Sequence, residues 1–515
     1  MDIRIRDNIF LLSSVSLIFI NIPKQIELNF LLGPMSGKLA VYFLLLGFFA
    51  WGIKNRDKLF RKKPLSKDTD LFIRYITIYC ILLILSMGYG LYNYQYFDDI
   101  LSGPYEQVDK LNHLYNFLQG FNLPFTREAL LSFWMIVRPV KGLLLDLLYT
   151  FVFSYMIYSW YKYDWKRGAF LLNQGVFISV IIILSYSVIE LFFLLGSVEA
   201  ADILSVINPY IHQITNGDWW PPLLWYGQLR SLFAEPSYYG IYSAFAMPWL
   251  WYSFIKAHGQ WRRIYGLTIF LFSFCLFLTK ARTAVLLFSG ELVLFTLYAL
   301  IYRHLLLKKY GIILLCSILA FFSSTIFINH EAQNAKNTLK ITTAESYLAD
   351  NMMSVASTDK RSNRARYSIM EAEFRIGLDH PVLGVGYSLR QAYIPDYLPE
   401  EAFSNHEIQG WLDFQKENGI MKSKFPPLGD YFVRFAETGL LGLIMFLLPA
   451  IYVLFKNIKM LCKHSINDGD RLLRIFFSIS FSGILVSGIG DTLNVTYCYW
   501  VLLGIGYAMK RKTME

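Results

Sequence analysis

The chain has 515 residues, of which 55% are hydrophobic and 17% are charged, and its mean hydropathy is +0.39. Soluble domains average roughly 25% charged residues, so this composition excludes an ordinary soluble globular protein. The formal net charge of +10 does not indicate a nucleic-acid-binding protein, because the basic residues fall in short stretches between apolar runs.

Apolar runs recur along the chain, and many approach the ~20 residues that a helix needs to cross a hydrocarbon core. They predict an all-α, polytopic integral membrane protein of about twelve transmembrane helices, because a helix satisfies its own backbone hydrogen bonds in lipid. The first run lacks a small-residue cleavage site and is interpreted as a span. The predicted spans are 8–22, 38–53, 71–93, 142–160, 169–196, 238–255, 264–279, 284–302, 311–328, 438–455, 472–489 and 493–509.

Lysine and arginine concentrate in the connections that follow alternate spans, as in "KNRDKLFRKKPLSK" and "KAHGQWRR". Such a bias is typical of cytoplasmic loops, so both termini are predicted to lie in the cytoplasm. The chain then divides into nine spans over 1–328, one large helical extracytoplasmic loop over 329–436, and three spans with a cytoplasmic tail over 437–515. Two shorter outer segments are expected near 95–141 and 197–237.

Part of the first outer segment is itself apolar. The stretch "REALLSFWMIVRPVKG" is interrupted by Arg138 and Pro139, so we expect a re-entrant or surface helix there. The five cysteines lie in predicted spans or in a basic loop, and no His/Cys cluster has metal-ligand spacing. The sequence therefore predicts no disulfide framework, no metal and no cofactor.

The first polar motif is "GQLRSLFAEPSYYG", which precedes an apolar run. Pro236 suits the first turn of a helix, and Glu235 before it would lie at the positive end of the helix dipole. Capping by Glu235, with Arg230 reaching lipid headgroups, is therefore one interpretation. A role in binding or catalysis is the other.

The second motif, "LTKARTAV", joins two apolar runs and holds Lys280 and Arg282. It falls on the predicted outer side, where basic residues are not topology signals. Charged groups at membrane depth usually face a cavity or a partner. Because guanidinium groups bind phosphate in a bidentate manner, Arg230 and Arg282 suggest a phosphate-bearing ligand at the lipid surface. An interface anchor is the alternative for Arg282.

Further candidates lie in and after the large loop. Arg366 and Arg375 fall on a predicted helix, and "HPVLGVGY" places Gly384 and Gly386 in a tight turn that could approach a ligand. The stretch "LGDYFVRFAETG" offers Asp430 and Glu437 as acid/base or capping groups. His406, in "FSNHEIQGW", is a candidate base because histidine titrates near neutrality.

In this order and spacing, the motifs resemble the O-antigen polymerase and O-antigen ligase superfamily of bacterial inner membranes. The resemblance covers Gln228 to about Leu447 and rests on "EPSYYG", "TKARTA", "HPVLGVG" and "AETGLLG". It implies a metal-independent, inverting glycosyltransferase that acts on undecaprenyl-diphosphate-linked glycans at the periplasmic face. Arg230 and Arg282 would hold the diphosphate, while Arg366, Tyr239, Lys280, Gly384 and Gly386 would contact the substrate.

The chain departs from the ligase pattern, in which a His-Asn pair precedes the "ETG" motif. Leu428 and Gly429 stand there instead, so His406, Asp430 and Glu235 all remain candidate bases. The departure favours a polymerase of O-antigen or exopolysaccharide. The alternatives are a ligase and a flippase of lipid-linked sugars, the latter kept open by Glu190, Glu291 and Asp491 near span interiors. The implied partners are membrane lipids, a chain-length regulator and a flippase.

Overall fold

The computed structural model describes residues 2–28, 32–60, 67–214, 221–334, 347, 361–463 and 466–509. It is 80% helical, with no strand among those residues, and seven helical segments are long and apolar enough to cross a membrane. The prediction of an all-α, polytopic membrane protein is confirmed. These seven segments are Leu71–Tyr92, Arg127–Tyr161, Trp165–Leu194, Gly259–Leu278, Arg282–Ile301, Arg303–Glu331 and Asp430–Leu461.

The other five predicted spans overlap helices that are shorter, less apolar or more charged than these seven segments. Two of the five contain the short apolar segments Leu39–Lys54 and Cys498–Ala508. The five helices concerned are α1 (Ile3–Val15), α3 (Leu39–Phe60), α11 (Pro236–Lys256), α20 (Asp468–Ser487) and α21 (Cys498–Ala508).

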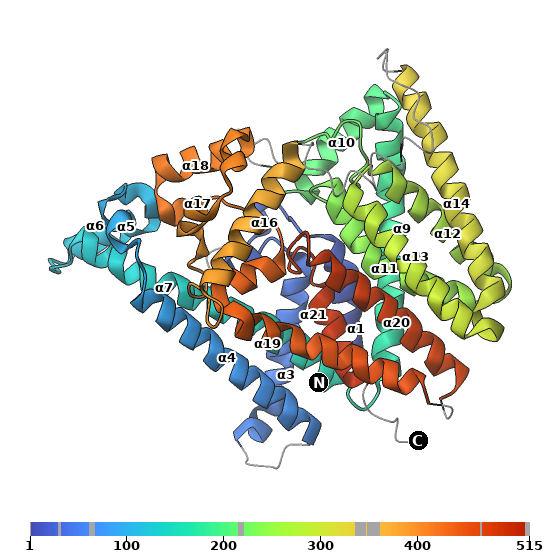
Figure 1. Cartoon of the computed structure of the whole chain (residues 1–515). Helices are drawn as coiled ribbons and strands as arrows, with labels where there is room; N and C mark the ends of the chain where they lie inside the picture. Colours follow the sequence, from blue (N-terminus) through green and yellow to red (C-terminus); the bar gives the residue numbers. More distant parts are fainter. Residues whose placement is uncertain are drawn as a thin grey trace.

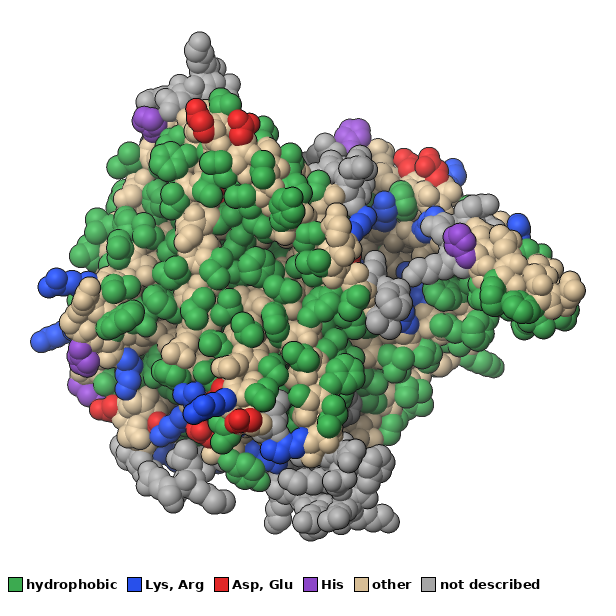
Figure 2. Space-filling model, turned by 180° about the vertical axis from the view of Figure 1, so that it is seen from behind, with side chains coloured by type: hydrophobic (Ala, Val, Ile, Leu, Met, Phe, Trp, Pro, Cys, Tyr) green, Lys and Arg blue, Asp and Glu red, His purple; other side chains and the backbone are tan. Residues whose placement is uncertain are grey.

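Helix α11 lies inside the bundle and packs against α9 (Trp165–Leu194), α12 (Gly259–Leu278), α13 (Arg282–Ile301) and α20 (Figure 1). It is apolar on every side, as expected of a helix surrounded by other helices, and Trp249 and Trp251 are fully buried. Helix α14 (Arg303–Asn334) lies at the edge of the bundle and exposes Ile312, Leu315 and Phe322. A broad apolar face on the molecule (Figure 2) suits contact with lipid tails.

Side-chain contacts identify two opposite ends of the bundle. At one end, Lys166 Nζ lies 3.0 Å from Asp470 Oδ1, and this ion pair joins the starts of α9 and α20. At the same end, Lys309 Nζ donates a hydrogen bond to Ile255 O at 2.9 Å. We call this the basic end. At the opposite end, which the sequence predicts to face away from the cytoplasm and which we call the outer end, Leu229 N–H donates to Leu278 O at 3.1 Å. Figure 2 shows lysine and arginine side chains gathered along one edge.

The described part of the 329–436 segment is helical and forms a cap. It comprises α16 (Arg361–Asp379), α17 (Ile394–Tyr397), α18 (His406–Asn418) and short 3₁₀ turns. Its own apolar core includes Ile369, Ile376 and Ile408. Most of the segment's first third, 335–346 and 348–360, lies outside the described residues.

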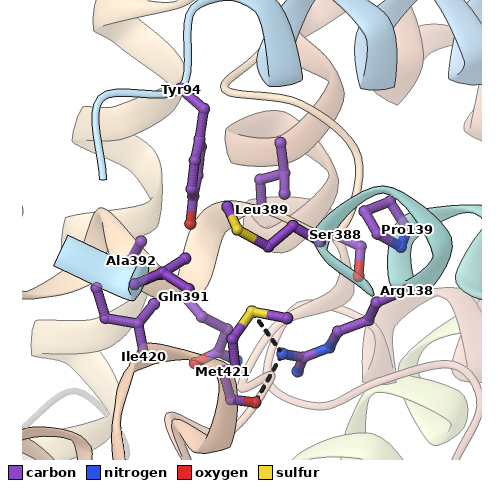
Figure 3. Close-up of a pocket in the computed structure, with 11 residues that line it drawn as sticks. Tyr94, Arg138, Pro139, Ser388, Leu389, Gln391, Ala392, Ile420 and Met421 are labelled. Atoms are coloured by element: carbon purple, nitrogen blue, oxygen red, sulfur yellow. Dashed lines mark hydrogen bonds between the residues drawn. The ribbon is translucent and has the colours of Figure 1, made fainter. Parts of the chain in front are cut away.

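The cap lies beside α5 (Phe97–Ser102), α6 (Asp109–Gly120) and α7 (Arg127–Leu148) (Figure 1). Arg138 on α7 donates from Nη1 to Met421 O at 2.7 Å and contacts Met421 Sδ at 3.7 Å, beside a pocket of about 20 Å³ (Figure 3).

The stretch 127–142, expected as a re-entrant or surface helix, begins a helical run that continues through the π-helical segment Tyr149–Tyr155 and α8 (Met156–Tyr161). Arg138 interrupts the apolar pattern of this helix. The hydrogen bond to the Met421 carbonyl in the cap gives its guanidinium a partner. Pro139 lies inside α7, which membrane helices tolerate.

Candidate functional site

A pocket of about 210 Å³ opens at the outer end, where α13 and α16 begin and α20 ends. It contains two guanidinium groups, those of Arg282 and Arg366, beside apolar walls. We call it the arginine pocket. Its lining residues are Arg282, Thr283, Leu286, Leu287, Arg366, Tyr367, Met370, Val486, Ser487, Ile489 and Gly490.

The hairpin between α12 and α13 places Arg282 at this pocket. Thr279 caps α12 and its Oγ1 accepts from Ala281 N–H at 3.2 Å, while Lys280 adopts a positive φ of 49° that reverses the chain. Helix α13 therefore begins at Arg282, where the positive end of its dipole adds to the guanidinium charge. Lys280 pairs with Glu331 on α14, at 3.3 Å, and does not line the pocket.

Two carboxylates lie beside the arginines. Glu235 is the N-cap residue of α11, but its side chain caps no backbone N–H; it accepts a hydrogen bond from the Ser237 hydroxyl. Asp491 lies in the loop between α20 and α21 and is 8% exposed. Burial raises the pKa of Asp491 to about 7; the charge of Arg366 opposes this rise, and that of Glu235 adds to it. The site thus combines two cations with a carboxyl group that titrates near neutrality.

Arg230 lies in a different cluster, in the loop before α11, and is 1% exposed. Glu190 on α9 accepts from the backbone N–H groups of Arg230 and Ser231, at 3.0 and 2.7 Å, which fixes this loop on the bundle. The guanidinium donates from Nη2 to Leu223 O at 3.2 Å and lies 5.9 Å from the Trp225 ring. Its Nη1 has no hydrogen-bond partner among the residues that the structure describes.

His212, at the end of α10 (Val198–Ile211), lies near Arg230. Burial lowers the pKa of His212 to about 3, and the charge of Arg230 lowers it further. This imidazole is therefore neutral at physiological pH, so it adds no positive charge to the cluster.

Asp430 is the first residue of α19 (Asp430–Leu461) and belongs to a buried ionic network. Its Oδ1 lies 3.5 Å from Arg434 Nε, and Arg434 also reaches Asp146 Oδ2 at 3.3 Å and the Tyr79 hydroxyl at 2.9 Å. A second buried group adjoins it, in which Arg390 pairs with Glu373 and lies 3.7 Å from Glu437 Oε1. Asp430 and Glu437 are thus each bound to an arginine.

Gly384 and Gly386 have positive φ angles of 68° and 106° and pack against backbone. A Cβ atom on Gly384 would lie 2.3 Å from the carbonyl carbon of Glu437, and one on Gly386 would lie 2.7 Å from Gly90 Cα. Val385 N–H donates to Ala436 O at 2.9 Å, in the same contact. The turn joins the cap to α19 and α4 (Lys67–Tyr92).

The last two predicted site residues lie apart from these clusters. Tyr239 is buried in the bundle, where its hydroxyl donates to Phe272 O at 3.1 Å. His406 is exposed on the first turn of α18, in the cap. The structure therefore brings Arg282 and Arg366 together in one pocket and places Glu235 near Asp491, whose charge Arg366 also affects. It places Arg230, Tyr239, Lys280, His406 and Asp430 elsewhere.

The sequence predicted Asp491 only as an acid near a span interior. In the structure it lies near Arg366, beside the arginine pocket. Its signal in the sequence is weak: the tetrapeptide "GIGD" follows an apolar run, at the end of the eleventh predicted span. The proximity of Asp491 to Arg366 depends on how the cap packs on the bundle, which no local pattern encodes.

Residues 267–447 match the model of the Wzy_C family, described as O-antigen ligase. This segment, about a third of the chain, is similar to the O-antigen ligase family. The match confirms the resemblance to the O-antigen polymerase and ligase superfamily, whose members act in glycan assembly. No curated protein matches the chain.

The matched segment includes both arginines of the arginine pocket, together with Lys280, the glycine turn, His406 and Asp430. Arg230, Glu235 and Tyr239 precede the segment, and Asp491 follows it. The pocket is therefore lined by the matched segment and by the end of α20 with the residues that follow it.

Proposed function

We propose that the protein is a membrane-embedded glycosyltransferase that polymerises undecaprenyl-diphosphate-linked repeat units into O-antigen or exopolysaccharide at the periplasmic face of a bacterial inner membrane. The observation that carries the proposal is the placement of Arg282 and Arg366 in one pocket with apolar walls. Such a pocket suits a ligand with a lipid tail and an anionic head, because guanidinium groups bind phosphate oxygens strongly.

In the proposed reaction, a sugar hydroxyl of the acceptor repeat attacks the anomeric carbon of the donor glycan. The bond between that carbon and the diphosphate oxygen breaks, and the lipid diphosphate leaves with the negative charge. Arg282 and Arg366 would stabilise this charge as it develops, as pre-organised cations do in other transferases. Attack opposite to the leaving group inverts the anomeric centre, with no metal and no covalent intermediate.

The hydroxyl proton needs a base, and the proposal assigns it to the carboxyl pair of Glu235 and Asp491. A base is most effective when its pKa lies near the working pH, which is the case for Asp491. Asp430 and His406 stay alternative bases, the first bound to Arg434 and the second exposed on the cap. The role of Arg230 as a contact to the diphosphate stays a prediction, since this arginine lies in a cluster apart from the arginine pocket.

A ligase that transfers the finished glycan to a separate acceptor is the second candidate, favoured by the description of the matched family. The two activities differ in their products. The experiment supplies the purified protein with lipid-diphosphate-linked repeat units and measures products by mass spectrometry.

A ladder spaced by one repeat unit would establish the polymerase, and one transfer to an added acceptor would establish the ligase. Lipid-linked sugar that crosses a vesicle membrane without forming a new glycosidic bond would instead contradict the proposal and favour a flippase. A chain-length regulator and a separate flippase are proposed partners of the polymerase.

A further inference from the structure

A second pocket lies at the basic end, between the last turns of α19 and α21 and the start of α20. It measures about 290 Å³, and four of its lining residues are cations: Lys456, Lys459, Lys463 and Arg474. Among the residues that the structure describes, no carboxylate lines it. A pocket with four positive charges and no acid is electrostatically suited to an anion.

Arg474 is the buried member of this group, with 3% of its surface exposed. Its Nη1 donates to Asn457 Oδ1 at 2.8 Å, its Nη2 donates to Met509 O at 2.7 Å, and its guanidinium lies 5.0 Å from the Trp165 ring. These contacts fix the side chain against the pocket. Its Nε, by contrast, has no hydrogen-bond partner among the described residues, and an unpaired buried donor is costly.

Cations at the end of α19 also have a simpler role, because they offset the negative end of the helix dipole and mark a cytoplasmic end. That role does not account for Arg474, which lies on α20 and is buried. Asp470 acts on its charge from the same helix, but that carboxylate is already 3.0 Å from Lys166 Nζ. Within the described part of the chain, the positive charge of the pocket is therefore only partly balanced.

We propose that this pocket binds the phosphate-bearing headgroup of an anionic membrane lipid. Basic pockets between membrane helices are known to recognise such headgroups. Two of the three helices, α19 and α21, are apolar segments, so a lipid in the adjacent leaflet could place its phosphate beside the lysines and its tails along the bundle. Arg474 Nε would donate one hydrogen bond, and the lysines would supply charge. This inference is independent of the proposed transferase activity.

The test compares binding of fluorescent phosphatidylglycerol and phosphatidylcholine to the purified protein in detergent. The double variant Lys459→Gln/Lys463→Gln removes two exposed cations without touching the buried Arg474. The matched control, Lys256→Gln/Lys308→Gln, removes two exposed lysines outside this pocket.

We expect wild-type protein to prefer phosphatidylglycerol and the pocket variant to bind it at least about tenfold more weakly, since each nearby cation contributes appreciably to such binding. The control variant should retain wild-type affinity. Equal weakening in both variants, or no preference for phosphatidylglycerol, would overturn the proposal. Displacement of the lipid by millimolar inorganic phosphate would assign the pocket to a free anion and contradict the lipid assignment.

Discussion

Arg282 and Arg366 line one pocket, although the first begins α13 and the second lies in α16, beyond the whole of α14. Two guanidinium groups in a small pocket repel each other, and the nearby Asp491 offsets part of that repulsion. A diphosphate would neutralise both cations at once. Both arginines lie in the segment that is similar to the O-antigen ligase family, so this pairing supports the transferase chemistry proposed for the chain.

Asp491 gives the reaction a specific pH dependence. Because its pKa is raised to about 7, the fraction able to accept a proton grows as pH rises through 7. We expect kcat/KM for glycosyl transfer to rise with a midpoint near pH 7, and Asp491→Asn to lower it by about 10²–10⁴. A wild-type profile that is flat around pH 7 would contradict the assignment of the base to Asp491.

The same carboxyl group affects stability in the opposite direction. Its pKa in the folded protein lies above the ordinary value of 3.8, so the folded state favours the protonated form. Stability from this group is present at low pH and is lost as pH rises toward and through 7. Thermal unfolding of the D491N variant should therefore show a weaker decline of Tm between acidic and neutral pH than the wild type.

Gly384 should not tolerate a side chain. At its φ of 68°, a Cβ would lie 2.3 Å from the carbonyl carbon of Glu437, so Gly384→Ala combines backbone strain with overpacking and should cost about 3 kcal/mol or more. Gly410→Ala is the control, since this glycine is exposed on α18 with open space around it. That change should be neutral or stabilising by up to about 1 kcal/mol. Equal yields of folded protein from both variants would contradict this account of the turn.

The pairing of Arg390 with Glu373 predicts a large stability effect. Burial raises the pKa of Glu373 to about 7 even though Arg390 opposes the rise. Arg390→Ala would leave Glu373 and Glu437 buried without their shared cation, at a cost of about 3–5 kcal/mol. Arg375→Ala, which breaks an exposed pair with Glu371 on the same face of the cap helix, should change stability by less than about 1 kcal/mol. Similar Tm values for the two variants would show that the buried group is not stabilising.

Hydropathy predicted the spans well because transfer of apolar side chains into lipid is a local property of each segment. The stretch that begins at Arg127 was harder to interpret. Arg138 interrupts its apolar pattern, and the Met421 carbonyl that accepts a hydrogen bond from that arginine lies in the distant cap. The sequence does not show that a distant segment supplies a partner for Arg138, so the continuous helix could not be predicted from its local pattern.

The candidate site was predicted in part. The motif around Arg282 was identified because a basic residue at an outer hairpin has no topological reason to be there. Its neighbours depend on how α16 and the loop between α20 and α21 pack together, so Asp491 and the closeness of Arg366 were not predictable from spacing. Conversely, "HPVLGVGY" suggested a ligand turn, whereas in the structure its glycines allow close contact between backbones.

The most direct test of the central claim is the rate of product-ladder formation from lipid-diphosphate-linked repeat units by Arg282→Ala and Arg366→Ala, with Arg375→Ala as the control. Arg375 lies on the same helix as Arg366 but is exposed and outside the pocket. Loss of transition-state charge stabilisation predicts about 10²–10³ lower kcat in each pocket variant and wild-type kcat in the control. Wild-type ladders from both pocket variants would contradict the assignment of the diphosphate to this pocket.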